Sequence, residues 1–123
     1  MQGRAKLSAM SADPFAADLA KLRAAVAGLA HVAERTYYGT PGWMAGKKML
    51  ARLREPGVVV LPVASEADKH LLIEAAPDIY FTIPHYDGYA MVLARMDAIS
   101  DAELAHRLRL AWDMLATAKM RKE

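Results

Sequence analysis

The sequence predicts an α+β fold, a two-layer sandwich in which three helices pack on one face of an antiparallel sheet of about five strands. Three amphipathic segments have helical spacing, and most strand-like segments follow one another without an intervening helix. A doubly wound parallel sheet would need strands and helices in regular alternation, which the pattern lacks. The chain has 123 residues, 54% of them hydrophobic, which indicates one globular domain.

The first helix is predicted between Asp13 and about Gly28. Asp13 and Pro14 form an N-cap followed by proline at the first helical position, where its fixed φ suits a helix start. Residues 1–12 are polar and without periodicity, so we expect a flexible N-terminal arm ahead of a single domain over 13–118. The apolar positions at helical spacing are Phe15, Leu19, Leu22, Val26 and Leu29.

Consecutive antiparallel strands joined by tight turns are predicted after this helix. Residues that favour strands lead into Gly39-Thr40-Pro41-Gly42, whose composition is typical of a turn. Further turn signals follow at Gly46-Lys47 and at Glu55-Pro56-Gly57. The strands that these turns separate are 34–38, 43–45, 48–54 and 58–61.

Two capping patterns predict where the remaining helices begin. Ser65 precedes Asp68, and Ser100 precedes Glu103, by the spacing at which a hydroxyl caps the first helical turn. Pro77 ends the first of these two helices, because the residue before a proline disfavours helical geometry. The rest of the chain is assigned to strands 79–82 and 89–96, to the loop 84–88 between them, and to a charged tail, 119–123.

Composition excludes several classes of protein. The chain has no cysteine, which excludes disulfides, thiolate zinc sites and cysteine nucleophiles. No apolar run follows Arg4 and Lys6, as a signal peptide would require, and no stretch approaches the ~20 apolar residues that cross a bilayer. We therefore expect a cytoplasmic protein without membrane association. A net charge of +2 does not by itself indicate a nucleic-acid partner.

Three short motifs follow one another along the chain: Tyr38-Gly39-Thr40-Pro41, Gly46 to Leu53, and Thr82 to Tyr89. In this order they resemble the YjbR/MmcQ family of small bacterial proteins, over nearly the whole chain. The resemblance implies a frataxin-like fold, with helices on one face of an antiparallel sheet, and a DNA-binding role. The chain departs from the family pattern at Leu50, where many relatives carry an aromatic residue, and at Ala90-Met91, where many carry Pro-Trp.

The strand 48–54 is predicted to have one apolar and one basic face, because side chains alternate along a strand. Met49, Ala51 and Leu53 are expected to point into the core. If strand 89–96 alternates in the same way, positive charges from both strands line the helix-free side of the sheet. The residues expected on that side are Lys48, Leu50, Arg52 and Arg54, and Tyr89, Met91, Leu93 and Arg95.

Two loops rich in aromatic residues flank this basic strand along the chain. Arginine and lysine can bind phosphates, and aromatic rings can stack on bases. The first hypothesis is therefore a small non-enzymatic protein that binds DNA or another nucleic acid. Trp43 fits either the core or such a recognition surface. The loop residues proposed to take part are Tyr37, Tyr38 and Trp43, and His85, Tyr86 and Tyr89.

Two alternatives remain open from the sequence. The same face, with Leu50, Met91 and Leu93 outward, could serve protein interaction or self-association as a homodimer. His85 and Asp87 lie two apart and could orient a general base in an enzyme, although the segment also suits a simple turn. No pattern of catalytic residues, cofactor binding or metal ligands is found in the sequence, so none is expected.

Overall fold

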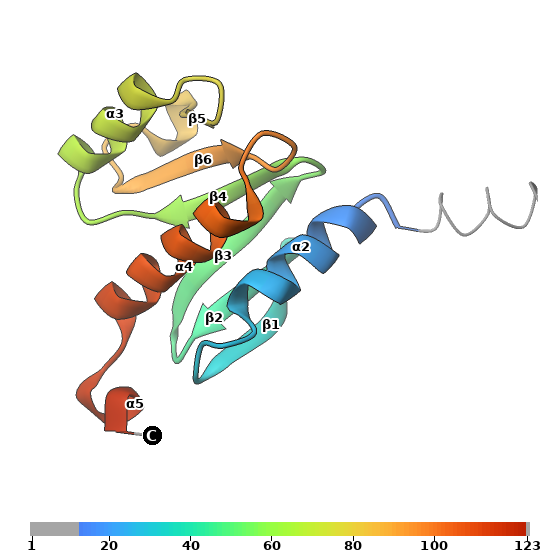
Figure 1. Cartoon of the computed structure of the whole chain (residues 1–123), viewed down its shortest axis with the longest axis vertical. Coiled ribbons are helices and arrows are strands. Elements are labelled where there is room, and N and C mark those ends of the chain that lie inside the picture. Colours follow the sequence, from blue (N-terminus) through green and yellow to red (C-terminus); the bar gives the residue numbers. More distant parts are fainter. Residues whose placement is uncertain (1–12, 123) are drawn as a thin grey trace, which may run out of the picture.

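The computed structural model describes residues 13–122, which form a six-stranded antiparallel sheet with helices packed against it (Figure 1). The strand order is β1-β2-β3-β4-β6-β5. The strands are β1 Val32–Tyr37, β2 Thr40–Ala45, β3 Lys48–Glu55, β4 Val58–Pro62, β5 Tyr80–Phe81 and β6 Met91–Arg95. The helices are α2 Ala16–Val26, α3 Glu66–Ala75, α4 Asp101–Leu115 and α5 Ala118–Lys122, with a 3₁₀ turn, η1, over Pro84–Tyr86.

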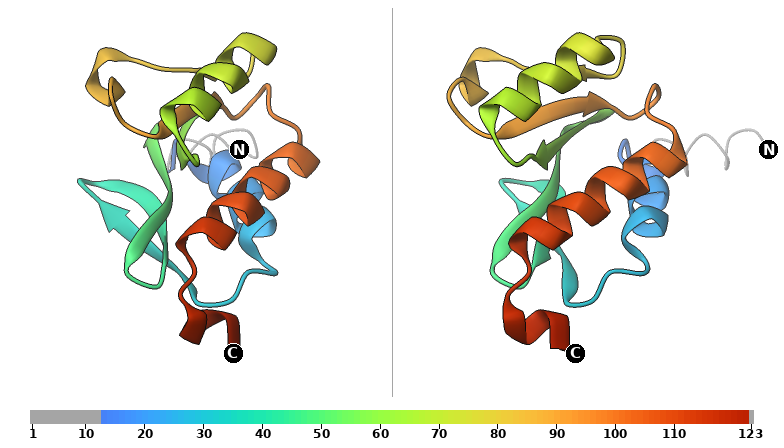
Figure 2. Two further views of the ribbon diagram at one scale, coloured as in Figure 1. Left: turned by 90° about the vertical axis from the view of Figure 1, so that its left-hand side faces the viewer. Right: turned by 60° about the vertical axis from the view of Figure 1, so that its left-hand side comes forward.

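Helices α2 and α4 cover one face of the sheet, whereas η1 lies on the other side (Figure 2). Helix α3 packs near β5 and β6. The main core lies between sheet and helices and contains Leu22, Leu53 and Leu108, all fully buried. The α+β class and the antiparallel sheet are thus confirmed, with six strands rather than about five.

Two segments were predicted to lie outside the packed domain, one at each end. The arm predicted over 1–12 lies outside the described residues. The segment predicted as a charged tail is helical over Ala118–Lys122, and Met120 is buried in the main core. The prediction relied on the basic residues of this segment and overlooked Met120. Helix α5 therefore belongs to the packed structure.

The predicted caps are present at the starts of α3 and α4. The Ser65 hydroxyl accepts a hydrogen bond from the Asp68 amide at 3.1 Å, and the Ser100 hydroxyl accepts one from the Glu103 amide at 3.0 Å. Each bond satisfies an amide of the first turn that has no partner within its own helix. Helix α2 begins at Ala16 with Phe15 as its N-cap residue, so Asp13, whose carboxylate accepts from the Phe15 amide at 2.8 Å, lies ahead of the helix. The prediction of Asp13 as the N-cap and Pro14 at the first helical position was wrong.

The first hairpin turns earlier than predicted. Tyr37 pairs with Thr40, so the turn consists of Tyr38 and Gly39 alone, and Pro41 and Gly42 belong to β2. The φ angles of Tyr38 and Gly39 are 50° and 83°. Positive φ at both central residues is the requirement of a type I′ turn, whose twist suits the strands it joins. The prediction of a turn over 39–42 was therefore wrong, because proline and glycine were both taken as turn residues.

A β-bulge between β2 and β3 reverses part of the predicted alternation. Trp43 lies opposite Ala51 and Met44 lies opposite Met49, which leaves Leu50 as an extra residue. As a result Leu50 and Ala51 are both buried in the main core, and Met49 packs on the other side of the sheet. Lys48 pairs with Ala45, a residue of the main core, and so also lies on the helical side. The predictions that Lys48 and Leu50 point outward and Met49 inward were wrong.

Gly42 is a point of close approach between β1 and β2. A Cβ atom at this position would overlap ring carbons of Tyr37 and would lie 3.1 Å from the Ala51 carbonyl oxygen. The Tyr37 ring can therefore lie across β2, where its hydroxyl donates to the sulfur of Met44. Glycine at 42 permits this packing, since any larger residue would displace the ring.

We expect Gly42→Ala to lower the free energy of unfolding by about 1–3 kcal/mol, the usual cost of overpacking. Urea denaturation would measure it. Gly28→Ala is the matched control, because a Cβ there meets nothing within 4 Å, and its effect should stay within about 0.5 kcal/mol. In the Tyr37→Ala background the ring is absent, so Gly42→Ala should cost much less unfolding free energy there than in the parent protein. Equal stability of the Gly42→Ala and Gly28→Ala proteins would contradict this packing.

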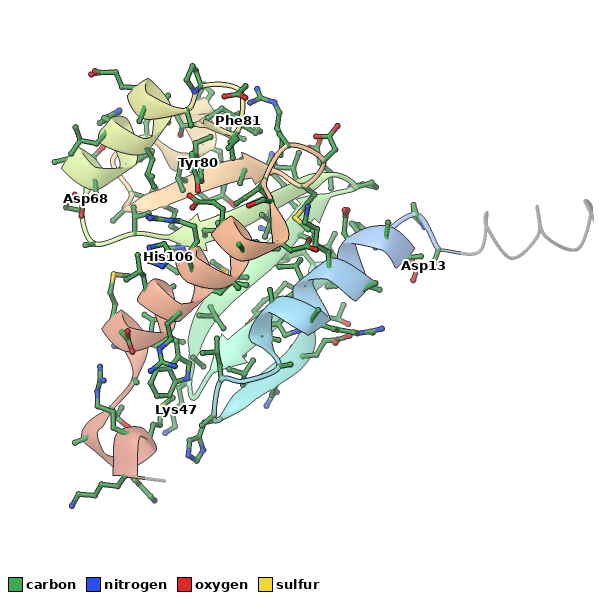
Figure 3. The ribbon with its side chains drawn as sticks, viewed as in Figure 1. Asp13, Lys47, Asp68, Tyr80, Phe81 and His106 are labelled. Atoms are coloured by element: carbon green, nitrogen blue, oxygen red, sulfur yellow. The ribbon has the colours of Figure 1, made fainter. Side chains whose placement is uncertain are left out.

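Tyr80 links the sheet edge to α4. Its ring, labelled in Figure 3, is buried and extends from β5. The Tyr80 hydroxyl donates a hydrogen bond to Glu103, whose carboxylate lies 3.5 Å from Nε of Arg107. Burial, and then the bond to Glu103, raise the pKa of Tyr80 well above its ordinary value of 10.0. The folded protein thus holds this phenolic proton more tightly than the unfolded chain does.

This proton makes stability depend on alkaline pH. Its contribution is complete below the unfolded pKa and is lost as pH rises above 10.0, because the unfolded tyrosine then ionises first. We expect Tyr80→Phe to be less stable than the parent by about 1.5–3 kcal/mol at about pH 8, and the gap to narrow at about pH 11. Urea midpoints at both pH values measure this. A gap that does not change with pH would contradict it.

Candidate functional site

The side of the sheet opposite α2 and α4, which we call the outer face, carries a row of arginines. Arg35 of β1 lies opposite Gly42 of β2, which in turn lies opposite Arg52 of β3. Cross-strand pairs share a face, so both arginines stand on the outer face about 10 Å apart, two strand spacings. Arg54 follows on the same strand. Arg35 is exposed, and Arg52 and Arg54 are half-buried.

Aromatic rings accompany these arginines. The guanidinium carbon of Arg52 lies 5.5 Å from the ring centre of Tyr38, and that of Arg54 lies 5.9 Å from the ring centre of Tyr86. These distances are those of cation–π contacts. Nε of Arg52 also lies 3.5 Å from the hydroxyl of Thr40. The outer face therefore carries arginines that contact aromatic rings. The predicted position of Arg52 and Arg54 on this face is confirmed.

Arg95 lies at the far edge of the outer face and is already engaged. It stacks on Phe81, with 4.3 Å between guanidinium carbon and ring centre, and donates to the carbonyl oxygens of Pro77 and Asp78 at 3.2 and 3.3 Å. Arg95 of β6 pairs with Val58 of β4, which places it on the same face as Arg54. The predicted coincidence of the three arginines on one face is therefore present, with Arg95 at its margin.

The outer face is covered around β4 and β6. Tyr86 of η1 is buried and packs with Val60 and Leu93 in a second apolar cluster, flanked by Met49 and Met91. Tyr86 therefore closes this part of the sheet and cannot stack on a base, contrary to prediction. The homodimer hypothesis relied on Leu50, Leu93 and Met91, and the first two of these are buried.

A buried lysine holds the covering loop in place. Lys69 of α3 is 1% exposed, and its Nζ donates to the carbonyl oxygens of Tyr86 at 2.7 Å and Tyr89 at 3.1 Å. A buried ammonium group is costly unless it is hydrogen-bonded, so these carbonyls determine where the lysine can sit. Lys69 in turn fixes the loop 84–89 over the second apolar cluster. The role of Lys69 was not predicted, because a lysine in an amphipathic helix ordinarily points to solvent.

The other predicted site residues lie in different environments. Trp43 is buried in the main core, which resolves its open assignment, and Lys48 lies opposite Ala45 at the hairpin end, off the row of arginines. Tyr37 is half-buried, and burial raises the pKa of its hydroxyl. Tyr38 and Tyr89 are 94% and 60% exposed. Arg35 was missed, although alternation around it in strand 34–38 could have identified it.

His85 and Asp87 are both exposed, and the His85 ring packs edge-on against Tyr86 with 4.8 Å between ring centres. Gly88 has a φ of 84°, as a turn requires, so the segment has the turn geometry that the sequence also suggested. Within residues 13–122, no three His, Asp or Glu side chains gather as metal ligands would. None of the helices in this range has the length and apolar character of a membrane span.

Fold and surface together define a class: a small α+β protein whose antiparallel sheet has a helical face and a basic, aromatic outer face. The model of the YjbR family matches residues 27–114. The chain belongs to this family, as the three sequence motifs predicted.

Similar proteins agree with this assignment. The uncharacterized protein Rv2570 of Mycobacterium tuberculosis is 33% identical over 96 residues, covering 63% of this chain and 74% of the relative. The uncharacterized protein Mb2600 of Mycobacterium bovis matches equally well. The crystal structure of Deinococcus radiodurans protein DR2400, with a DUF419 domain, is similar with a TM-score of 0.67 at 22% identity, covering 82% of this chain and 83% of that one. This structural likeness shows the fold.

We expect Lys69→Met to lower the free energy of unfolding by about 1.5–3 kcal/mol, because two carbonyl oxygens lose a charged donor. Hydrogen exchange should also quicken at the amides of Asp87 and Tyr89, which bond within the loop, and stay unchanged in α4. Lys47→Met, at an exposed turn, is the control. Slow loop exchange in the Lys69→Met protein would show that Lys69 does not hold the loop.

Proposed function

We propose that this protein binds nucleic acid, without catalysis, through the part of the outer face formed by β1, β2 and β3. The observation that carries the proposal is the alignment of Arg35 with Arg52 across these strands, beside the exposed ring of Tyr38. Cations that contact phosphates and rings that contact bases are the two components of sequence-tolerant single-strand binding.

The geometry supports different roles for these residues. Arg35, Arg52 and Arg54 bind backbone phosphates, and Tyr38 offers a ring for stacking. Tyr89, the last residue of the covering loop, provides a second exposed ring. The carboxylate of Glu55 lies 4.0 Å from Nε of Arg54. At this distance the carboxylate compensates the positive charge of Arg54 only in part. Arg95 and Tyr86 are given no direct contact, because both are engaged within the protein.

We expect a fluorescein-labelled single-stranded oligonucleotide to bind in an anisotropy titration at about 50 mM salt, with affinity that falls steeply as salt rises. Arg52→Ala and Arg54→Ala should each weaken binding and reduce the salt slope by about 0.7 for each phosphate that is no longer neutralised. Tyr38→Ala should weaken binding by about 1–3 kcal/mol with an unchanged slope.

The matched control is Arg109→Ala, because Arg109 is an exposed arginine on α4, on the opposite side of the sheet, that pairs with Asp113 at 3.4 Å. Its loss should leave the titration unchanged. Absence of binding at about 50 mM salt would refute the proposal, and so would equal effects of Arg52→Ala and Arg109→Ala.

A further inference from the structure

An apolar groove runs between α3 and α4, on the helical side of the molecule. Its volume is about 690 Å³, and Pro62, Val63 and Ala64 also line it. It is separate from the outer face, and the proposed nucleic-acid contacts make no use of it.

The two walls of the groove have the same spacing. Helix α3 contributes Asp68, Leu71, Leu72 and Ala75, and α4 contributes Arg107, Leu110, Ala111 and Met114, with Asp113 beside them. Both sets follow positions i, i+3, i+4 and i+7, the stripe with which one helix packs against another. Seven residues of helix span about 10 Å, so each wall is about two turns long. A third helix of at least two turns would complete this packing.

Exposed apolar side chains concentrate at this groove. Leu71, Leu110 and Met114 are 62%, 41% and 42% exposed, and all three line it. The other large apolar residues exposed among 13–122, Tyr38 and Tyr89, lie elsewhere. Leucines and a methionine that project beside an open groove are typical of a surface that a protein partner covers. A small enclosed ligand would instead be surrounded by its pocket.

The charged residues at the groove indicate which charge a partner should carry. Arg107 lies 3.5 Å from Glu103, and Asp113 lies 3.4 Å from Arg109, so both charges are offset by ion pairs within α4. Nε of Arg107 is itself buried and makes no hydrogen bond within residues 13–122. Asp68 is exposed on α3, where Figure 3 labels it, and its backbone amide, rather than its carboxylate, bonds to Ser65. The carboxylate therefore provides the charge that a partner can complement, and complementarity requires a cation.

We propose that the α3–α4 groove binds an amphipathic helix of another protein, with apolar residues at i, i+4 and i+7 and a lysine or arginine beside them. The apolar side chains enter between Leu71 and Leu110, and the cation meets Asp68. This mode of binding is that of helix-in-groove complexes, in which one amphipathic helix lays its apolar stripe against two others.

A pair of stapled, fluorescein-labelled helical peptides tests the proposal. Both carry leucine at i, i+4 and i+7; one has lysine at the flanking positions and the other has glutamate. In anisotropy titrations we expect the lysine peptide to bind at least about tenfold more tightly than the glutamate peptide. Leu110→Glu in the protein should weaken the lysine peptide by at least about tenfold, and Asp68→Asn should remove most of the difference between the peptides.

Two controls keep the result specific. Tyr38→Glu changes an exposed aromatic residue outside the groove and should leave peptide binding unchanged, whereas Leu110→Glu should leave oligonucleotide binding unchanged. Circular dichroism and thermal melting confirm that each variant folds. Failure of both peptides to bind, equal affinity of the two peptides, or indifference to Leu110→Glu overturns the proposal. A dimer in sedimentation that Leu110→Glu dissociates would also overturn it, because a second copy would then occupy the groove.

Discussion

The single extra residue in the β2–β3 ladder determines which side chains this protein shows on each side of its sheet. Without the bulge at Leu50, strict alternation would send Met49 to the core and Leu50 to the opposite side. With it, Leu50 and Ala51 fill the space beneath α4, and Arg52 still emerges on the outer face in line with Arg35. Because of this one-residue shift in register, β3 supplies both buried core residues and arginines of the outer face.

The outer face is divided between two physical roles. Around β1 to β3 it is basic and open, with Tyr38 projecting from a type I′ turn. Around β4 and β6 it is apolar and closed by Tyr86, which removes Val60 and Leu93 from water. Arg54 stands at the boundary, because it stacks on Tyr86 while its charge stays near solvent. Closing the apolar half also protects a sheet that would otherwise expose a large hydrophobic patch.

The sequence was informative where local rules suffice. Capping residues located the starts of α3 and α4, and turn residues separated most of the strands. Proline and glycine were misleading at positions 41 and 42, since both belong to β2, where Gly42 lies against the Tyr37 ring. The bulge, the burial of Tyr86 and the inward turn of Lys69 depend on contacts between distant segments, which periodicity in one segment cannot reveal. Of the candidate site, Arg52, Arg54 and the exposed Tyr38 and Tyr89 were predictable, whereas the burial of Trp43 and Tyr86 was not.

Lys69 joins two surfaces that would otherwise be independent. Its backbone belongs to α3, one wall of the groove, while its ammonium group holds the loop that closes the outer face. A displacement of α3 must therefore either carry the loop with it or break both hydrogen bonds of Lys69. Thermodynamic reciprocity applies to such a connection: whatever free energy a ligand at one surface transmits through Lys69, a ligand at the other surface returns in equal measure. A side chain that touches neither ligand would then set the size of their coupling.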